Sequence, residues 1–259
     1  MDLNIQGRTA LITGASRGIG RAIARALGAE GCDLHLAARS EEGLRAVADE
    51  VAQAHGVKAT IHACDLSGPE AVAALGAECA EVDILINNAG DIPSGTLTGI
   101  DSATWRQCWN LKVFGYVELT RAILPRMEAR GSGVVVNVVG AAGESPNPNY
   151  IAGCMGNAAL MMFTRCLGGD SIRHGVRVVG VNPGATLSDR HLAHVKERAE
   201  RRLGDPERWP ELEAKNPSGR TSRVEEIADA VAFLASDRAS HIAGEILRID
   251  GGVHSHYWR

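Results

Sequence analysis

The chain has 259 residues, of which 45% are hydrophobic and 22% charged, and its formal net charge is -4. This composition is ordinary for a soluble globular protein and gives no overall reason to bind nucleic acid or an anionic membrane. The N-terminal sequence lacks a basic segment followed by an apolar one, and no apolar stretch is long enough to cross a bilayer. We therefore expect a cytoplasmic protein with neither nucleic acid nor a membrane as its partner.

The first predicted strand, "TALIT", runs directly into the glycine-rich turn "GASRGIG" and then into an apolar helix. Strand, turn and helix together specify a dinucleotide site, whereas the glycine pattern alone is a weak signal. Gly14 permits the tight turn, Gly18 lets the backbone approach a pyrophosphate, and Gly20 lets the helix pack close to the strand. The free N–H groups at the start of the helix would then bind phosphate.

The second predicted strand ends in the residues Ala37, Ala38, Arg39 and Ser40. Dinucleotide sites that select NAD usually carry an Asp or Glu near this point, which binds the ribose 2′-OH. Here there is no carboxylate, and Arg39, together with Arg17 from the glycine turn, can pair with a 2′-phosphate. The sequence therefore favours NADP(H). The alternative, in which Arg39 is a surface arginine at a helix start, leaves the cofactor specificity open.

Further along the chain, short β-branched runs continue to alternate with helix-length segments, a pattern typical of a parallel sheet covered on both faces. S-x-x-E capping boxes predict helix starts at Ser67 to Glu70 and at Ser222 to Glu225. The mixed charge of the segment at about 187–217 fits equally a mobile helical flap over the strand ends and a solvated helix pair. We otherwise expect a single doubly wound α/β domain over residues 1–259, with seven strands at "RTALIT", "CDLHLAA", "VKATIHA", "VDILIN", "GVVVNVV", "GVRVVGVN" and "EILRID".

Several motifs follow one another in the order and spacing of a known family. They are "TGASRGIG", "CDL" at Cys64 to Leu66, "NNAG" at Asn87 to Gly90, "WNLKVFG", and "NPG" at Asn182 to Gly184. The chain thus resembles the short-chain dehydrogenase/reductase family over almost all of its length, which implies a Rossmann fold and an NAD(P)-dependent oxidoreductase. The resemblance also implies an adenine contact for Asp65 and a catalytic water for Asn110. The predicted cofactor site comprises Gly14, Ser16, Arg17, Gly18, Ile19, Gly20, Arg39, Ser40, Asp65, Leu66, Asn88, Ala89, Gly90, Asn157, Pro183, Gly184 and Ser188.

In this family a Ser orients the substrate carbonyl, a Tyr transfers a proton, and a Lys binds the ribose and lowers the Tyr pKa. The resemblance of "VVVNVVG" to the family strand places the Ser at Gly140, and that of "AALMMFTRCLG" to the following helix places the Tyr at Gly153 and the Lys at Asn157. These positions keep the family spacings of thirteen and four residues, which indicates a substituted triad. The alternative register, with Tyr150 as the Tyr and Cys154 at the Lys position, requires a shift of three residues. Neither register supplies a lysine.

Tyr150 could replace the missing acid, because residues three apart share a face when the helix runs through both. The alternative is that Tyr150 only packs the start of the helix. Asn157 could still hydrogen-bond the ribose, while Asn110 would lose its water relay without the lysine. For Ser188, where the family often has a Thr, we favour a contact with the nicotinamide carboxamide over a helix cap. The candidate catalytic residues are therefore Asn110, Tyr150 and Asn157, with Gly140 and Gly153 at the usual Ser and Tyr positions.

Neither the cysteines nor the histidines predict a metal site. The six cysteines are scattered without C-x-x-C pairs, which favours reduced, buried thiols over disulfides or zinc ligands. His191 and His194 are three residues apart but lack an obvious carboxylate or third ligand. In the segment at about 187–217, arginines alternate with glutamates, so helical ion pairs explain most of these charges. An acidic substrate is the alternative explanation for the arginines.

Together these features predict an NADP(H)-dependent oxidoreductase with an atypical active site, acting on a small carbonyl or alcohol substrate. Two alternatives stay open. One is a catalytically degenerate NADP-binding subunit or scaffold without redox turnover, and the other is non-redox chemistry on the same fold. The resemblance further implies a homotetramer or homodimer, and it allows a complex with an active relative.

Overall fold

Seven parallel strands form the central sheet, as the alternating sequence predicts. The computed structural model describes residues 2–255, the side chain of Arg190 excepted. The strands are β1 (Thr9–Thr13), β2 (Asp33–Ala38), β3 (Ala59–Ala63), β4 (Ile84–Asn87), β5 (Gly133–Val138), β6 (Val176–Pro183) and β9 (Ile246–Ile249). Their order across the sheet is β3-β2-β1-β4-β5-β6-β9, so the direction of winding reverses between β1 and β4. This is the point at which a doubly wound sheet forms a ligand-binding crevice.

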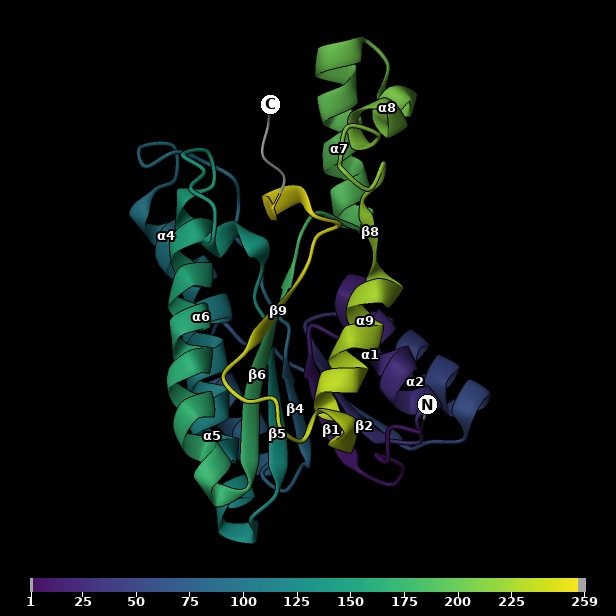
Figure 1. The fold of residues 1–259 in the computed structure, drawn as a ribbon, viewed down its shortest axis with the longest axis vertical. Helices are drawn as coiled ribbons and strands as arrows, with labels where there is room; N and C mark the ends of the chain where they lie inside the picture. Colours follow the sequence, from purple (N-terminus) through teal and green to yellow (C-terminus); the bar gives the residue numbers. More distant parts are fainter. Residues whose placement is uncertain (1, 256–259) are drawn as a thin grey trace.

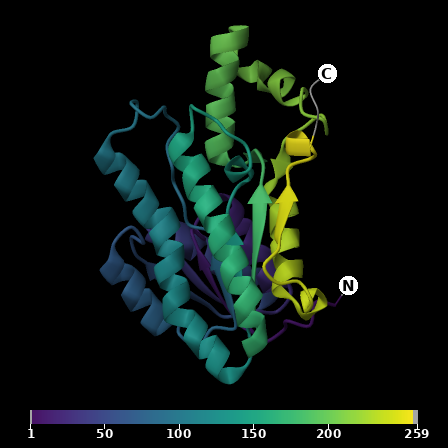
Figure 2. The same ribbon diagram turned by 60° about the vertical axis from the view of Figure 1, so that its left-hand side comes forward.

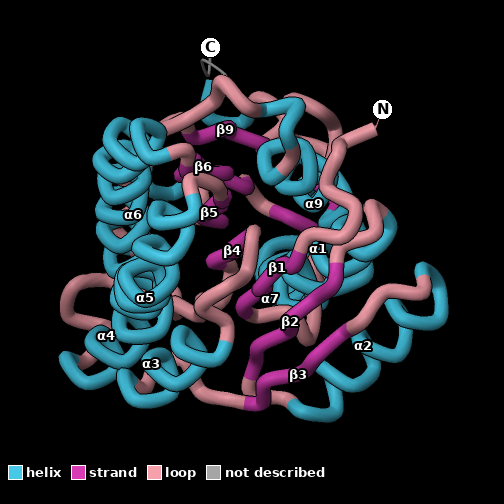
Figure 3. The backbone as a smooth tube through the Cα atoms, turned by 90° about the horizontal axis from the view of Figure 1, so that it is seen from below, coloured by secondary structure: helices cyan, strands magenta, loops and turns pink. Residues whose placement is uncertain are grey.

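Helices cover both faces of the sheet (Figures 1 and 3). One layer consists of α1 (Gly18–Ala29), α2 (Glu41–His55) and α9 (Val224–Ala235), and the other of α3 (Pro69–Glu78), α4 (Ser102–Trp109), α5 (Gly115–Arg130) and α6 (Ile151–Ser171). Each layer buries an apolar stripe against alternate residues of the strands, which gives one large hydrophobic cluster on each face. The short helices are the π-helix η1 (Asn110–Phe114) between α4 and α5, and the 3-10 turns η2 (Ala141–Gly143), η3 (Ile172–His174), η4 (Pro206–Arg208), η5 (Asp237–Ala239) and η6 (Val253–Ser255).

The segment after β6 rises beyond the carboxyl ends of the strands (Figure 2). It contains α7 (Asp189–Leu203) and α8 (Trp209–Glu213), and the strand pair β7 (Thr186–Leu187) and β8 (Ser222–Arg223) lies at its base. Val195, Ala199 and Leu212 are buried in a small apolar cluster of its own. The sequence predicted helices here, but it did not predict the strand pair. Within residues 2–255, no helix combines the length and apolar character needed to cross a membrane.

Both predicted capping boxes are wrong, because each helix starts later than its serine requires. Gly68 precedes α3, whose first residue is Pro69, and the Ser67 N–H donates to Asp65 instead, at 3.0 Å. Proline favours the first helical position, so the cap moves to the residue directly before it. Ser222 is part of β8, so the N-terminal cap of α9 is Arg223 and the helix begins at Val224.

Candidate active site

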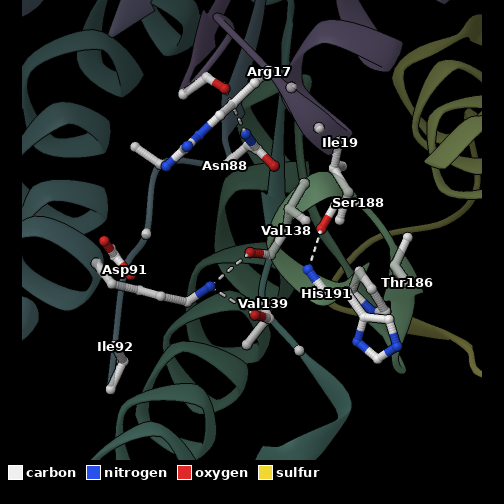
Figure 4. A pocket seen from close by; sticks show the side chains of 18 of the residues that line it. Arg17, Ile19, Asn88, Asp91, Ile92, Val138, Val139, Thr186, Ser188 and His191 are labelled. Atoms are coloured by element: carbon white, nitrogen blue, oxygen red, sulfur yellow. Dashed lines mark hydrogen bonds between the residues drawn. The ribbon is translucent and has the colours of Figure 1, made fainter. Parts of the chain in front are cut away.

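A cavity of about 1000 Å³ lies at the carboxyl ends of the strands, next to the point where β1 and β4 diverge (Figure 4). Its walls come from the loops after β1, β2, β4, β5 and β6 and from the start of α7. All residues of the predicted cofactor site line this cavity except Asp65. The Asp65 carboxylate accepts the Ser67 N–H, and this hydrogen bond lowers the pKa of Asp65. The sequence thus located the cavity, and Asp65 stabilises a turn beside it.

The glycine turn between β1 and α1 is shaped by its backbone. Gly14 has a φ of +68°, and a Cβ at this position would lie 2.9 Å from Asn88 Nδ2. A Cβ at Gly20 would overlap the carbonyl oxygen of Gly14, because α1 starts directly against the turn. At Gly18 the nearest atom to a Cβ would be Ser188 Cβ, at 3.7 Å. The turn is therefore closely packed on the protein side, and it leaves room for a ligand at Gly18 and at the N-terminus of α1.

Hydrogen bonds hold the end of β4 against this turn. The Thr13 hydroxyl accepts the N–H groups of Asn88, at 2.9 Å, and Ala89, at 3.0 Å. Asn88 Nδ2 donates to the carbonyl of Thr13 at 2.9 Å. One layer further into the sheet, buried Asn87 Nδ2 donates to Asn137 Oδ1 at 2.9 Å, which joins β4 to β5. These bonds fix the two strand ends that form the floor of the cavity.

Two arginines and a helix N-terminus line the cavity. Arg39 and Ser40 follow β2, and Arg17 comes from the glycine turn. The Ser40 hydroxyl accepts the Gly43 N–H at 3.1 Å and so caps α2. Guanidinium groups and exposed helical N–H groups both favour a bound anion of the phosphate type.

At the end of β5, Gly140 lies beside Asn157 of α6. Gly140 has a φ of +138°, and a Cβ there would lie 2.9 Å from Asn157 Nδ2. The Gly140 N–H donates to Asn182 Oδ1 at 3.3 Å. Asn157 is only 4% exposed, and its Oδ1 has no hydrogen-bond partner within the described part of the chain. A buried acceptor of this kind at a cavity wall is suited to a donor on a ligand.

Tyr150 lies just before the helix rather than within it. α6 begins at Ile151, and the carbonyl of Tyr150 accepts the N–H groups of Gly153 and Cys154. The sequence argument required a helix that runs through both Tyr150 and Gly153, and this requirement is not met. A Cβ at Gly153 would nevertheless overlap the Tyr150 ring, so this ring occupies the space that a side chain at position 153 would need. Tyr150 both lines the cavity and packs, like Trp109, against the apolar cluster that includes Ile92 and Ala152, so its two predicted roles are compatible.

Lys112 also lines the cavity, and the sequence did not predict this. It extends from the π-helix η1, and its Nζ donates to the carbonyls of Val138, at 3.3 Å, and Val139, at 2.8 Å, as the dashed lines in Figure 4 show. Val139 directly precedes Gly140, so the ammonium group lies beside the end of β5. Both positions predicted for the family Lys lie in α6, whereas Lys112 comes from η1. The signal that could have found Lys112 was its place two residues after Asn110 in "WNLKVFG".

Asn110 does not join the cavity. It is exposed at the first position of η1, and its carbonyl accepts the N–H of Gly115 in the π-helical pattern. The next two residues of η1, Leu111 and Lys112, line the cavity in its place. A π-helical turn shifts the register of the side chains, and this shift directs the lysine rather than the asparagine toward the cavity.

Ser188 forms the helix cap that the sequence disfavoured. Its hydroxyl accepts the His191 N–H at 3.3 Å at the start of α7, although Ser188 also lines the cavity. His191, His194 and His254 also line the cavity. Nε2 of His191 lies 3.4 Å from a carboxylate oxygen of Glu213. The cavity lining therefore includes imidazole groups from α7 and from the C-terminal part of the chain.

The sheet order, the glycine turn and the cavity at the switch point define a dinucleotide-binding protein of the Rossmann class. Residues 8–199 match the family described as short chain dehydrogenase. The chain belongs to this family of oxidoreductases.

Two relatives and one solved structure illustrate the similarity. The chain is 36% identical to the 3-oxoacyl-[acyl-carrier-protein] reductase FabG of Escherichia coli, over 97% of this chain and 99% of that protein. It is 31% identical to gluconate 5-dehydrogenase of Gluconobacter oxydans, over 96% of each chain. The structure of L-sorbose reductase from Gluconobacter frateurii, complexed with NADPH and L-sorbose, has a TM-score of 0.93 and 32% identity, over 99% of this chain and 100% of that one.

Proposed function

We propose that the protein is an NADP(H)-dependent oxidoreductase that interconverts a small polar carbonyl compound and its alcohol. The family's Ser, Tyr and Lys positions hold Gly140, Gly153 and Asn157 in this chain. In this proposal Tyr150 donates the proton, Lys112 supplies the positive charge, and Asn157 hydrogen-bonds the cofactor. The observation that carries the proposal is that the glycine turn and these three side chains line one cavity. A nucleotide seated on the turn would therefore extend toward them.

The residues of the cavity fit NADP(H). Arg17 and Arg39 suit a 2′-phosphate, and the turn at Gly18 with the N-terminus of α1 suits the pyrophosphate. The buried Oδ1 of Asn157 can accept a hydrogen bond from a ribose hydroxyl. When bound, the cofactor supplies or accepts the hydride, and the protein orients the reactants and moves the proton. The solved complex of L-sorbose reductase with NADPH supports this choice of cofactor.

Tyr150 is the proposed proton donor. Phenols ordinarily titrate near pH 10, so a phenol at the cavity wall is a proton donor at neutral pH. This favours carbonyl reduction over alcohol oxidation. Lys112 places a positive charge at the end of β5, where it would stabilise negative charge that develops on the substrate oxygen or the phenol. Asn157 contributes hydrogen bonds but no charge.

The proposed substrate is small and polar, of the polyhydroxy carbonyl type. The cavity lining also includes His191, His194 and His254, together with Asp189 and Asn147. Such groups can hydrogen-bond several hydroxyls at once, whereas an acyl chain would prefer an apolar wall. L-sorbose, which is bound in the related reductase, is a molecule of this class. We further propose that α7 and α8 form a flap over the cavity.

A cofactor-binding subunit without turnover is the less favoured alternative. The relatives named above are reductases and dehydrogenases, and the cavity retains a proton donor and a cation. A location in the cytoplasm and a homotetramer or homodimer are also part of the proposal, since they follow from the family resemblance. Sedimentation at micromolar concentration would test the assembly, and a monomer would contradict it.

Deuterium transfer from stereospecifically labelled NADPH tests the proposal. Purified protein would be incubated with a ketose, a 3-oxoacyl thioester and a simple aldehyde, and the products read by mass spectrometry. We expect the label in the reduced ketose, and a transfer rate that is roughly 10² to 10⁴-fold lower in Tyr150→Phe because the general acid is lost. The affinity for NADPH, measured by fluorescence, should be unchanged in that variant.

Gly153→Ala provides a second test, because its methyl group must displace the Tyr150 ring while the hydroxyl is retained. We expect a loss of turnover comparable to that of Tyr150→Phe. If no substrate acquires label from the wild type, the protein only binds the cofactor. If Tyr150→Phe transfers label at the wild-type rate, Tyr150 is a packing residue.

A further inference from the structure

Three potential metal ligands meet at the β3 edge of the sheet, outside the lining of the active-site cavity. They are His35 of β2, His62 of β3 and Cys79 at the C-terminal end of α3. His62 pairs in register with Ala37, two residues after His35, so both imidazoles project from the same face of the sheet. α3 covers this face and places Cys79 over the two rings. Residues distant in sequence are thus brought together by the strand pairing and the helix.

We propose that these three side chains form a binding site for a zinc-like divalent transition metal ion. His35 Nδ1 and His62 Nε2 are 2.8 Å apart, and Cys79 Sγ lies 3.5 Å from the first and 3.7 Å from the second. Tetrahedral zinc with ordinary Zn–N and Zn–S bond lengths requires separations of about 3.3 Å between nitrogens and about 3.6 Å between nitrogen and sulfur. The nitrogen–sulfur distances already match. The imidazoles need to separate by only about 0.5 Å, which exchanges their mutual hydrogen bond for two metal bonds.

A carboxylate is placed as the outer partner of one ligand. Glu78 Oε2 lies 3.4 Å from His62 Nδ1, the ring nitrogen that does not face the cluster. Histidine ligands commonly donate this second N–H to a carboxylate, which fixes the tautomer and makes the other nitrogen a better ligand. Glu78 is the last residue of α3, where the helix dipole disfavours an acidic side chain. The contact with His62 offsets this unfavourable position.

Burial prepares the imidazoles for metal binding. His62 and Cys79 are 9% and 2% exposed, and burial lowers the pKa of His35, with a smaller contribution from His62. A neutral imidazole is the form that ligates a metal. Burial also raises the pKa of the Cys79 thiol to about 12, so the ion must displace this proton to solvent when the sulfur–metal bond forms. Two imidazoles and a thiolate suit zinc or cobalt and leave a fourth position for water.

The site would link β2, β3 and α3 at an edge of the sheet, and it does not depend on the proposed function. Cobalt(II) is the probe, since a tetrahedral cobalt thiolate absorbs in the near ultraviolet and gives d–d bands in the visible. Full-length protein stripped with a chelator should bind one equivalent of cobalt with both signals, and zinc should displace it. Metal binding should also raise the melting temperature, because the ion binds the native state in preference to the unfolded one.

Variants assign the signals to individual side chains. Cys79→Ser should lose the near-ultraviolet band. Glu78→Gln should keep the band but bind about 10 to 100-fold more weakly, because only the outer partner changes. Its side chain is 64% exposed, so this variant tests the site without disturbing the core. Cys166→Ser removes an exposed thiol and is the matched control, with no change expected.

Three results would overturn the proposal. The first is a wild type that gives no near-ultraviolet band with cobalt at a fivefold excess. The second is a band that persists in folded Cys79→Ser, as judged by circular dichroism. The third is equal cobalt affinity in Glu78→Gln and the wild type, which would mean that His62 is not a ligand held by Glu78.

Discussion

The glycine turn after β1 and the start of α6 face the same cavity, but they are constructed differently. The turn acts through its backbone, so Gly14 and Gly20 are restricted by atoms that touch them directly. The start of α6 acts through side chains, and the space at Gly153 is filled by the ring of a neighbour, Tyr150. A site formed by backbone atoms depends on the conformation of one segment. A proton donor or a charged group, in contrast, can come from a side chain of any element that reaches the cavity.

The strongest test of this contrast is Gly14→Ala. The new methyl group would be strained at a φ of +68° and would lie 2.9 Å from Asn88 Nδ2. Strain of about 1–3 kcal/mol and displacement of the turn should together weaken NADPH binding on the order of 10³-fold. Gly56→Ala is the control, because Gly56 has a φ of +71° but nothing within 4 Å of its Cβ position. Equal NADPH affinities in the two variants would refute the backbone explanation.

Lys112→Met tests whether η1 supplies the positive charge that the family's Lys on the helix corresponding to α6 provides. Loss of the ammonium group beside the end of β5 should lower kcat on the order of 10²-fold, as for other groups that stabilise developing charge. The Kd for NADPH should change little. Lys58→Met removes an exposed lysine outside the cavity and should leave kcat unaltered. A wild-type kcat in Lys112→Met would assign this lysine to packing against Gly90.

Arg39→Ala tests the selection of the nucleotide by a side chain of the cavity. Loss of charge-assisted hydrogen bonds should weaken NADPH binding about 10 to 100-fold, while NADH binding changes little. Arg45→Ala is the matched variant, since Arg45 lies on α2 in an exposed ion pair with Glu41. We expect its ratio of NADPH to NADH affinity to equal that of the wild type. An unchanged ratio in Arg39→Ala would leave Arg17 as the residue that selects the phosphate.

The smallest effect is expected at the start of α9, away from both regions. Glu226 pairs with Arg220 and also accepts the Arg223 N–H at 2.8 Å, and these two contacts, in that order of size, lower the pKa of Glu226 to about 2 from 4.5. A lowered pKa adds stability above pH 4.5 that is lost as the pH falls toward 2. Glu226→Gln should cost about 1 kcal/mol at neutral pH, and the two unfolding curves should converge in acid. Glu225→Gln, its neighbour in the first turn, should show no such convergence.

Features that depend on a local pattern of residues could be predicted from the sequence. Alternating β-branched runs predicted all seven strands of the sheet, and the strand, turn and helix around Gly14 predicted where the cavity lies. Asp65 and Asn110 are not among the residues that line the cavity, because the resemblance gives a position in the chain but not the direction of a side chain, and their roles stay predictions. The capping boxes failed for a related reason, since Pro69 and the pairing of Ser222 in β8 decide where the helices begin.

Contacts between side chains that are distant in sequence could not be predicted in this way. Lys112 reaches the end of β5 because η1 directs it there, and Tyr150 fills the space at Gly153 because the chain turns just before α6. His35, His62 and Cys79 come together through strand register and the packing of α3, although no short spacing in the sequence relates them. A local motif encodes backbone shape within a few residues. Contacts between side chains of different elements depend on how those elements pack, and this is set by the whole core.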